Sequence, residues 1–369
     1  MKILLLANID LGLYKFRKEL LEMLLVDNEV YFCTPDGEYT GIMQEMGCKF
    51  IPCNVLDRRS TNPVKDLKLI SFYERTIKDV QPDLVLTYTI KPNVYGGIVC
   101  TRNRVPYIAN ITGLGTTIEN GGLLAFISKR LYRLGLKKAK CVFFQNQENQ
   151  KLFITERIVS GRTRLIPGSG VNLNTHCYEP YPSEDLGIRL LFVGRIMKDK
   201  GIEELLKVIR KLHSEKKDIV LDVVGFCDED YSQLLDEAEK EGAIVNHGVQ
   251  SDVHPFYTAA HCTVLPSYHE GMANVMLESA STGRPVITTR VPGCKETFTE
   301  GITGFGCEVR SIRSLENAIA EFLKLPYEKK EEMGRQGRKK MELEFDRNII
   351  LKAYQEEIFE SSVGPPRQK

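Results

Sequence analysis

Several patterns that would place a protein in a narrow class are missing from this sequence. Its ten cysteines form no C-x-x-C pair and no Cys/His pairing, which favours reduced thiols over a disulfide framework or a zinc site. No apolar run approaches the roughly 20 residues of a membrane span, and the opening MKILLLAN is far shorter than the apolar core of a signal peptide. These absences predict a cytoplasmic protein.

Two further signatures, one for nucleotides and one for metals, are also absent or weak. No G-x-G-x-x-G follows a strand, because TGLGTT stops before a third glycine, and this argues against a dehydrogenase. The segment CDEDY places Asp228 and Asp230 at D-x-D spacing, but acids in such a loop are usually solvated. We therefore expect no catalytic metal and no cofactor.

The charge of the chain is small in total but uneven along its length. The net charge is +1, yet residues 1–170 carry 24 Lys and Arg against 16 Asp and Glu. Between Asp83 and Glu148 there are nine basic residues and a single acid, Glu119. Such a surplus suggests a polyanion or an anionic membrane surface beside the first half. Of these partners we expect the membrane, and no nucleic acid.

The order of apolar runs predicts the fold. With 369 residues the chain exceeds the size at which one hydrophobic core stops growing. Short apolar runs alternate with longer periodic segments in two series, the first from KILLLAN to RLIPGS and the second from RLLFVGR to FGCEV. Alternating strands and helices predict parallel sheets covered on both faces. We predict an α/β fold with two Rossmann-like, doubly wound domains that face each other across a cleft.

The domain boundaries follow from breaks in these patterns. Residues 172–187 are aperiodic and contain two prolines, so they are the predicted linker between domains at 1–171 and 188–345. We predict that 346–369 forms a helix that returns to the first domain, with VGPPRQK as a disordered tail. Ligands of open parallel sheets bind beyond the carboxyl ends of the strands, so the chemistry is expected there.

The first candidate site motif is FVGRIMKDKGIEELL, which has the pattern of strand, basic loop and helix. Arg195 and Lys200 lie on the loop, and Gly194 and Gly201 relieve crowding beside them. A guanidinium fork and an ammonium at the end of a strand can hold a diphosphate and neutralise the charge that grows as it departs. The alternative is a solvated loop.

The second motif is HEGMANVMLE, which precedes and opens a predicted helix. Glu270 comes before the helix, residues 271–273 offer backbone N–H groups, and Asn274 stands near the first turn. The start of a helix favours an anion, so a phosphate can lie there. Glu270 and Glu278 would then accept hydrogen bonds from sugar hydroxyls on either side. The alternative is that these acids only complement the helix dipole.

Together these residues resemble the E-x7-E signature of retaining glycosyltransferase family 4, whose fold is GT-B. The resemblance covers nearly the whole chain. It implies that Arg195 and Lys200 bind the donor diphosphate, that Glu278 binds the ribose and that Glu270 binds the transferred sugar. The family commonly has Phe where this chain has Met272, a change expected to alter the shape of the pocket.

The resemblance also implies where the nucleobase lies. It places the base at the loop after VLDVVG and at the segment NHGVQ, mostly through backbone contacts. The complete set of donor-binding residues is then Gly12, Arg195, Lys200, Gly225, Phe226, Val249, Glu270, Gly271, Met272, Ala273, Asn274 and Glu278. Of these, Glu270, Arg195 and Lys200 are the predicted catalytic residues.

The first half carries a narrower resemblance, to bacterial members that extend O-antigen, capsule or related lipid-linked glycans. The matching segments are IDLGLYKFRKEL, TYTIKPNVYGG, NITGLGTT and FFQNQEN. Gly12 would let the backbone approach a phosphate, although a simple turn glycine before a solvated helix is the alternative. Many relatives have a histidine in this half, whereas all six histidines here lie beyond residue 170. The predicted acceptor-binding residues are Lys15, Arg17, Lys91, Asn110 and Thr112.

The resemblance implies a reaction with retained anomeric configuration. The expected donor is a UDP-sugar carrying an N-acetylhexosamine, and the expected acceptor is a saccharide linked to a polyprenyl diphosphate. Because no nucleophile for a double displacement stands out, same-face attack assisted by the departing diphosphate is favoured. The alternatives are a UDP-sugar epimerase with the same architecture and a nucleotide-sugar-binding scaffold without turnover.

One basic and apolar segment suggests membrane contact. LLAFISKRLYRLGLKKAKC combines seven large apolar residues with six basic ones. An apolar stripe bordered by basic side chains can lie in an anionic interface. The alternative is a helix that buries its stripe on the sheet. The predicted membrane-facing residues are Lys129, Arg130, Arg133, Lys137 and Lys138, which would hold the protein peripherally on the cytoplasmic face.

Overall fold

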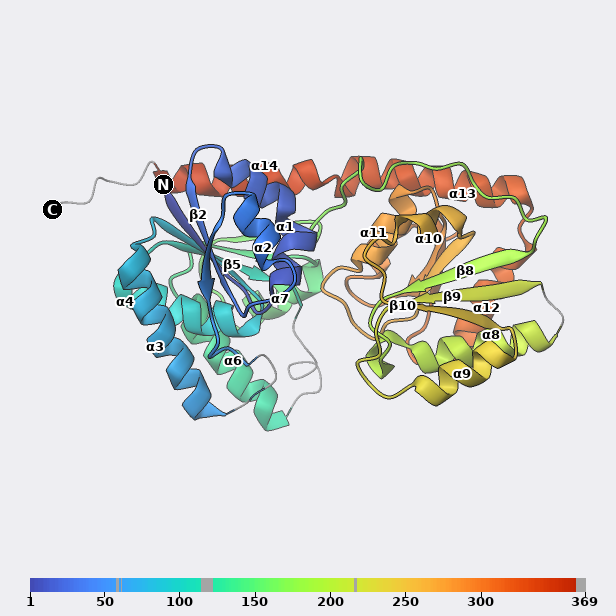
Figure 1. Cartoon of the computed structure of the whole chain (residues 1–369), viewed down its shortest axis with the longest axis horizontal. Helices are drawn as coiled ribbons and strands as arrows, with labels where there is room; N and C mark the ends of the chain where they lie inside the picture. Colours follow the sequence, from blue (N-terminus) through green and yellow to red (C-terminus); the bar gives the residue numbers. More distant parts are fainter. Residues whose placement is uncertain (58–59, 61, 114–121, 216–217, 363–369) are drawn as a thin grey trace. The chain divides into compact units, whose positions relative to one another are not determined.

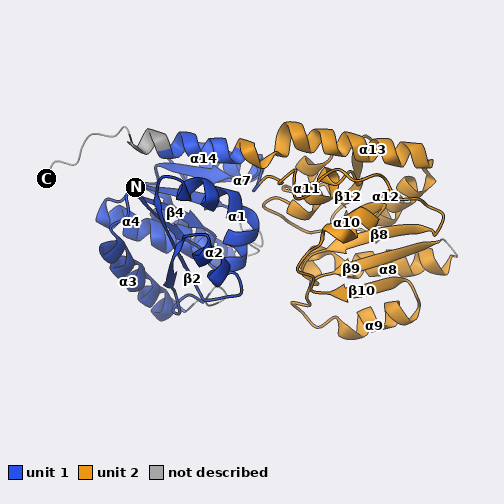
Figure 2. Ribbon diagram, turned by 45° about the horizontal axis from the view of Figure 1, so that its top comes forward, with its two compact units in different colours: residues 1–169, 350–369 blue, residues 170–349 orange. Residues whose placement is uncertain are grey.

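The computed structural model spans the whole chain, and the structure describes residues 1–57, 60, 62–113, 122–215 and 218–362 (Figure 1). The tail at 363–369, predicted to be disordered, lies outside the described residues. The chain divides into two compact units (Figure 2). The first unit comprises Met1–Ser169 and Ile350–Lys369, and the second comprises Gly170–Ile349.

The first unit is built on a seven-stranded sheet with the order β3-β2-β1-β4-β5-β6-β7, in which all pairs are parallel. Its strands are β1 (Lys2–Leu6), β2 (Glu29–Thr34), β3 (Lys49–Pro52), β4 (Leu84–Tyr88), β5 (Tyr107–Ile111), β6 (Cys141–Phe144) and β7 (Thr163–Leu165). Its helices are α1 (Asp10–Leu25), α2 (Thr40–Glu45), α3 (Pro63–Val80), the π-helical turn η1 (Pro92–Gly96), α4 (Gly97–Asn103), α6 (Gly122–Leu136) and α7 (Gln147–Thr155).

The second unit is built on a six-stranded parallel sheet with the order β10-β9-β8-β11-β12-β13. Its strands are β8 (Ile188–Val193), β9 (Ile219–Val224), β10 (Ile244–Gly248), β11 (Cys262–Leu265), β12 (Val286–Thr289) and β13 (Gly304–Cys307). Its helical segments are η2 (Lys198–Lys200), α8 (Ile202–Ser214), α9 (Ser232–Lys240), α10 (His254–Ala259), α11 (Asn274–Ser281), η3 (Lys295–Thr297), α12 (Ile312–Lys324), α13 (Tyr327–Lys340) and η4 (Met341–Phe345).

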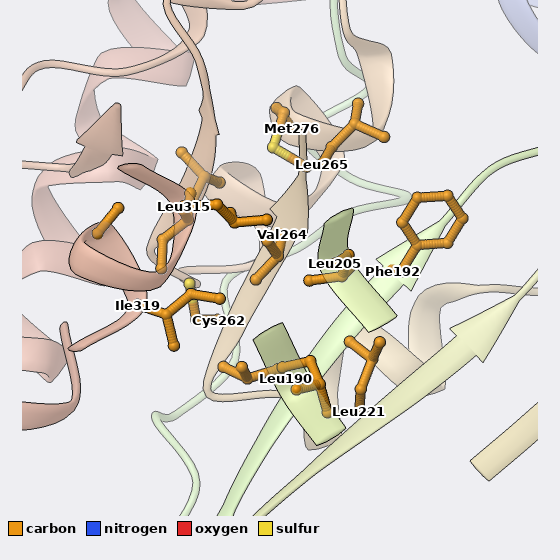
Figure 3. Close-up of a cluster of buried hydrophobic side chains, with 14 of the residues drawn as sticks. Leu190, Phe192, Leu205, Leu221, Cys262, Val264, Leu265, Met276, Leu315 and Ile319 are labelled. Atoms are coloured by element: carbon orange, nitrogen blue, oxygen red, sulfur yellow. The ribbon is translucent and has the colours of Figure 1, made fainter. Parts of the chain in front are cut away.

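Both sheets are covered by helices on two faces, which explains why the sequences of their strands are nearly continuous apolar runs. In β1, Leu4 and Leu6 join a cluster with α3, α4 and α6, whereas Ile3 and Leu5 join the cluster with α1 and α14 (Figure 1). Strand β8 alternates in the same way. Figure 3 shows Leu190 and Phe192 beside Leu205 of α8, and the alternate residues of the strand, Leu191 and Val193, pack with Tyr257 of α10.

The C-terminal helix α14 (Arg347–Ser362) joins the first unit from Ile350 onward. Tyr354 lies edge-on against Phe143 of β6 with ring centroids 4.9 Å apart, and Tyr88 donates a hydrogen bond of 3.2 Å to its hydroxyl. The C-terminal helix therefore contributes core residues to the unit formed by the first half of the chain. Residues 172–187 consist of turns and extended chain.

The predicted fold class is confirmed: the chain has two α/β units, each with a parallel sheet. Every apolar run that defined the two predicted series forms a strand at its expected place. The prediction succeeded because a parallel strand buried on both faces needs apolar residues at nearly every position.

Candidate functional site

Apart from Gly12, the predicted donor-binding residues follow the carboxyl ends of strands of the second sheet, on the loops there or in the first turns of α11. Because β9, β8 and β11 are neighbours, the loops that follow them are neighbours too. The backbone N–H of Tyr268 donates to the carbonyl of Asp199 over 2.8 Å, which ties the loop after β11 to η2. A Cβ at Gly225 would lie 1.8 Å from the carbonyl oxygen of Gly194, and its φ is +149°. A glycine is therefore needed where the loops after β8 and β9 meet.

The predicted residues Lys200 and Glu270 are brought into direct contact. The ammonium of Lys200 donates a hydrogen bond to the Glu270 carboxylate, and the two side chains are 18% and 14% exposed. Partial burial weakens solvent screening, so this pair is held more firmly than a surface ion pair. It places one positive and one negative group together at the carboxyl end of β11.

Arg195 also has an acidic partner. Its guanidinium donates to Asp228 over 2.9 Å, and the arginine side chain is 43% exposed while Asp228 is 12% exposed. Asp230, the other acid of the D-x-D letters, accepts from the backbone of Ser232 at 3.3 Å. In this arrangement Asp228 orients the guanidinium, and the two acids serve different structural partners.

The start of α11 differs from the prediction in its backbone donors. The N–H of Ala273 donates to the carbonyl of Gly293 over 2.7 Å, and that of Asn274 donates to Met272 over 3.0 Å. The Gly293 carbonyl uses the Ala273 donor and the Met272 carbonyl uses the Asn274 donor, so these two N–H groups are not free for an anion. Asn274 keeps a buried side-chain oxygen that has no hydrogen-bond partner among the described residues.

Met272 is a core residue. It is 6% exposed and belongs to the main hydrophobic cluster of the second unit together with Ala273. Met272 therefore packs in the hydrophobic core of the unit, and its effect on the shape of the pocket stays a prediction.

Glu278 is positioned by a residue that sequence reasoning missed. The hydroxyl of Tyr257, on α10, donates to the Glu278 carboxylate over 2.8 Å. Tyr257 is fully buried, and burial, with a smaller contribution from Glu278, holds the pKa of its phenol well above the usual range. The phenol therefore stays protonated and acts as a donor. Nothing in the local sequence links these residues, because they lie on different helices.

The thiol of Cys294 lies beneath the Lys200–Glu270 pair, and it is not reactive as a nucleophile. It is completely buried, and burial followed by the charge of Glu270 raises its pKa to about 12. A thiol with that pKa remains protonated at neutral pH, whereas nucleophilic attack requires the thiolate. Cys294 is a packing residue beneath the Lys200–Glu270 pair.

The other predicted donor contacts are less defined by the structure. Phe226 and Val249 are large apolar side chains that are 45% and 71% exposed beyond β9 and β10. In the first unit, Gly12 lies within α1, and a Cβ added there would meet only Ile9 at 3.6 Å. These positions are open to a ligand, and their contacts remain predictions.

Three of the predicted acceptor residues are used within the first unit. Arg17 is 4% exposed and lies 5.3 Å from the ring of Tyr88, and Lys91 is 9% exposed and pairs with Asp66 at 2.8 Å. Asn110 is 2% exposed, accepts from Tyr354 and donates to the carbonyl of Thr87 over 3.1 Å. Because its amide is satisfied inside the unit, we withdraw Asn110 as an acceptor contact.

The remaining acceptor predictions lie nearer the surface. The ammonium of Lys15 lies 5.5 Å from the ring of Tyr39, and Thr112 is half-buried directly after β5. These two residues stay predictions for the acceptor.

Helix α6 combines a buried face with an exposed apolar ridge. Its buried residues are Ala125, Tyr132, Gly135 and Leu136. The apolar ridge of α6, which is 44–75% exposed, comprises Leu123, Leu124, Phe126 and Ile127. The helix therefore buries one face in the unit and exposes apolar side chains elsewhere, and membrane contact by the exposed residues stays a prediction. Among the described residues, no helix has the length and apolarity needed to span a bilayer.

The basic residues of this region fall into two groups. Lys129 pairs with Glu156 at 2.7 Å, and Arg133 donates to two carbonyls of the α7 end at 2.9 Å. Arg130 lies over the ring of Phe126 at 5.1 Å, while Lys137 and Lys138 are exposed after the helix. Lys129 and Arg133 thus hold α6 to the unit, and the other three are better placed to meet a surface.

Two parallel-sheet α/β units, with basic and acidic groups paired at the strand ends of the second, define a glycosyltransferase of the GT-B class. Residues 181–340 match the family described as Glycosyl transferases group 1, and residues 2–146 match Glycosyl transferase 4-like. The chain belongs to the retaining glycosyltransferases of family 4.

Individual relatives agree with this assignment. The N,N'-diacetylbacillosaminyl-diphospho-undecaprenol alpha-1,3-N-acetylgalactosaminyltransferase of Campylobacter jejuni is 26% identical over 371 residues, covering 96% of this chain and 97% of that one. The capsular polysaccharide glycosyltransferase CapM of Staphylococcus aureus is 33% identical over 164 residues, covering 43% and 42%. The crystal structure of Anabaena HepE with UDP and glucose has a TM-score of 0.76 at 18% identity, covering 97% and 99%.

Proposed function

We propose that this enzyme transfers an N-acetylhexosamine from a UDP-sugar to a saccharide carried on a polyprenyl diphosphate, with retention of configuration. The observation that carries the proposal is the Lys200–Glu270 pair, with Arg195 on the same loop as Lys200. Support for the substrates comes from the Campylobacter relative, whose acceptor is a diphospho-undecaprenol sugar, and from HepE, which holds UDP.

Arg195 and Lys200 would bind the diphosphate of the donor. Asp228 and Glu270 balance their charges in the protein alone. An arriving diphosphate offers the two cations stronger, multivalent partners, and Lys200 can then bridge the phosphate and Glu270. As the bond to the sugar breaks, charge grows on the leaving oxygen, where two fixed cations stabilise it most.

Glu270 would accept hydrogen bonds from hydroxyls of the transferred sugar, and Glu278 from the ribose. The Tyr257 hydroxyl occupies one side of the Glu278 carboxylate and fixes its orientation. The unsatisfied side-chain oxygen of Asn274 would gain a partner from a bound donor. Glu270 precedes α11, whereas Asn274 and Glu278 lie within it.

The chemical step breaks the bond between the anomeric carbon and the β-phosphate oxygen, and the oxygen keeps the electron pair. The acceptor hydroxyl forms the new bond on the same face of the sugar. Its proton passes to the departing phosphate oxygen, so the products are the α-glycoside and UDP. This route needs no enzyme nucleophile, and Cys294 is too strongly protonated to be one.

A donor panel tests the proposal. UDP- and GDP-activated hexoses and N-acetylhexosamines would each be incubated with a short prenyl-diphosphate-sugar acceptor, and the products read by mass and by the anomeric NMR coupling. We expect the acceptor to gain one N-acetylhexosamine, from UDP donors, in α configuration. Conversion of the donor without acceptor would establish the epimerase instead, and binding without any product would establish the scaffold.

We also propose that the apolar ridge of α6 contacts an anionic membrane, where a polyprenyl-linked acceptor resides. Four large apolar side chains are exposed together near the start of α6, Arg130 lies over the ring of Phe126, and Lys137 and Lys138 are exposed after the end of the helix. Apolar side chains at the interface and basic residues near an anionic surface both favour binding, the latter by about 1 kcal/mol each.

Flotation with vesicles tests this surface. Phosphatidylcholine vesicles with and without phosphatidylglycerol would be compared for the wild type and a Leu124→Ser, Phe126→Ser variant. We expect anionic vesicles to bind the wild type and to bind the variant at least about tenfold more weakly. Leu186→Ser is the matched control, since Leu186 is 95% exposed in the second unit. Equal binding by all three proteins would reject the ridge as the membrane contact.

A further inference from the structure

Three side chains of the second unit bring a thiol, a carboxylate and an imidazole to one point. Cys177 and Glu179 lie in the segment 172–187, and His254 is the first residue of α10. The Cys177 sulfur lies 3.3 Å from Glu179 Oε1 and 3.9 Å from His254 Nε2, and these last two atoms are 3.6 Å apart. Among the described residues, this is the one group of three or more such side chains with the spacing of a metal site.

The triangle matches the ligand spacing of a tetrahedral zinc ion. Zinc bonds to sulfur at about 2.3 Å and to nitrogen or oxygen at about 2.0–2.2 Å. Around a tetrahedral centre these lengths place neighbouring ligand atoms about 3.3–3.7 Å apart. The three observed separations therefore differ from the ideal edges by only a few tenths of an ångström, which small side-chain rotations would remove.

The backbone that carries these ligands is firmly held. The N–H of Glu179 donates to the carbonyl of Thr282 over 3.1 Å, and the buried Arg284 donates to the Glu179 carbonyl over 2.9 Å. The carbonyl of His176 accepts from both Ser281 and Arg338, at 2.6 and 3.0 Å. Such anchoring means that the ligands need little ordering when an ion arrives, which lowers the cost of binding.

We propose that Cys177, Glu179 and His254 form a binding site for a zinc-class divalent cation, with a fourth position open to water. One thiolate, one imidazole and one carboxylate are the ligand types that zinc takes in proteins. Cys177 is exposed, so an ion can reach the site from solvent. On binding, the thiol releases its proton to the buffer as the sulfur–metal bond forms.

An ion at this site would connect residues 177–179 to α10, the helix whose Tyr257 contacts the predicted donor-binding residue Glu278. His254 begins α10, and Tyr257 of the same helix donates to Glu278. The ring of His176 lies edge-on to those of His254 and Tyr257, with centroids 5.8 and 5.9 Å away. The metal would therefore pin residues 177–179 to the helix that positions Glu278. The site itself does not depend on which sugar the enzyme transfers.

Cobalt substitution tests the proposal on the full chain. The metal-free protein, kept reduced with a phosphine, would be titrated with Co²⁺. The bound Co²⁺ would then be displaced with Zn²⁺. We expect one equivalent of Co²⁺, with a sulfur-to-cobalt charge-transfer band and the intense visible bands of four-coordinate geometry. Loss of a ligand should be severe, because loss of even a hydrogen-bond partner of a metal ligand costs about 10–100-fold in affinity.

Three variants and one control decide the outcome. Cys177→Ser should abolish the charge-transfer band, and Glu179→Gln and His254→Gln should each weaken Zn²⁺ binding at least about 100-fold and remove its effect on the melting temperature. Cys227→Ser is the matched control, because Cys227 is also exposed, and it should bind like the wild type. Retention of the band and stoichiometry in Cys177→Ser, or equal losses in Cys227→Ser, would overturn the assignment.

Discussion

The two units have the same doubly wound architecture but use their charged residues differently. In the second unit, basic and acidic side chains pair at the ends of strands while remaining 12–43% exposed, as in Lys200–Glu270 and Arg195–Asp228. In the first unit, Arg17 and Lys91 are 4% and 9% exposed and are used by the fold itself. The first unit also exposes the apolar ridge of α6.

Under the proposed function, this difference would let one fold serve two kinds of ligand. Loops that end in accessible ion pairs can exchange an internal partner for a charged ligand at small cost. Ions that are buried and paired cannot do so, because removing one partner leaves an uncompensated charge. We therefore expect substitutions in the second unit to act on chemistry and those in the first to act on stability or surface binding.

The largest expected effect is on turnover in the second unit. Lys200→Ala should lower turnover about 10²–10³-fold, because it removes a fixed positive charge from the leaving diphosphate. Lys198→Ala is the matched control, since Lys198 is an exposed lysine of the same η2 turn. Initial rates at saturating donor measure both. Equal losses in the two variants would mean that only the net charge of the loop matters.

The next largest effect is a loss of stability in the first unit, in contrast to the loss of turnover in the second. Asn110→Ala should lower the free energy of unfolding by about 2–3 kcal/mol, because Tyr354 and the Thr87 carbonyl lose their buried partner. Turnover at low temperature should stay near that of the wild type. Hydrogen exchange of β4 and β5 amides measures the stability of this unit.

The exposed residue Asn54 provides the control for that substitution. Asn54→Ala should change stability by less than about 0.5 kcal/mol. A selective loss of turnover in Asn110→Ala, with unchanged hydrogen exchange, would restore Asn110 as an acceptor contact.

A smaller effect separates the two glutamates of the second unit. Glu278→Ala should weaken UDP binding about tenfold, the equivalent of one or two hydrogen bonds, whereas Glu270→Ala should chiefly lower turnover. Tyr257→Phe keeps the buried ring and removes only the donor to Glu278, so UDP should bind about 3–10-fold more weakly. Calorimetry with UDP and steady-state kinetics distinguish these results. If Glu270→Ala and Glu278→Ala changed the dissociation constant for UDP and the turnover number to the same extent, the division of roles would be refuted.

The smallest expected effect is that of Gly12→Ala in the first unit, and Gly225→Ala in the second unit provides the contrast. Gly12→Ala should leave stability unchanged or raise it by about 0.5–1 kcal/mol, because Gly12 is helical and has space for a Cβ. Gly225→Ala should be destabilising, since the new Cβ would meet the Gly194 carbonyl. Thermal melts measure both. A loss of turnover in a stable Gly12→Ala variant would support close approach of a phosphate to this position.

Much of the site could be predicted because it follows local rules. Arg195, Lys200, Glu270 and Glu278 all lie on, or one helical turn beyond, loops that leave the carboxyl ends of strands. A strand end can be recognised from the apolar run before it, so these residues could be selected from the sequence, while the roles predicted for them came from the family resemblance. The same logic failed for Asn110, because a strand end does not reveal whether the side chain turns toward solvent or into the unit.

The sequence by itself determined the two α/β units and the order of strands and helices. Buried parallel strands require continuous apolar runs, and amphipathic helices require apolar residues at helical spacing, so both can be recognised in the sequence. Only the tertiary structure decided which distant residues meet. Tyr257 and Glu278 come together because α10 and α11 pack in one unit, and Cys177 reaches His254 across 77 positions of sequence. The absence of Cys/His spacing argued against a zinc site, yet contacts made by packing carry no local spacing from which they could be predicted.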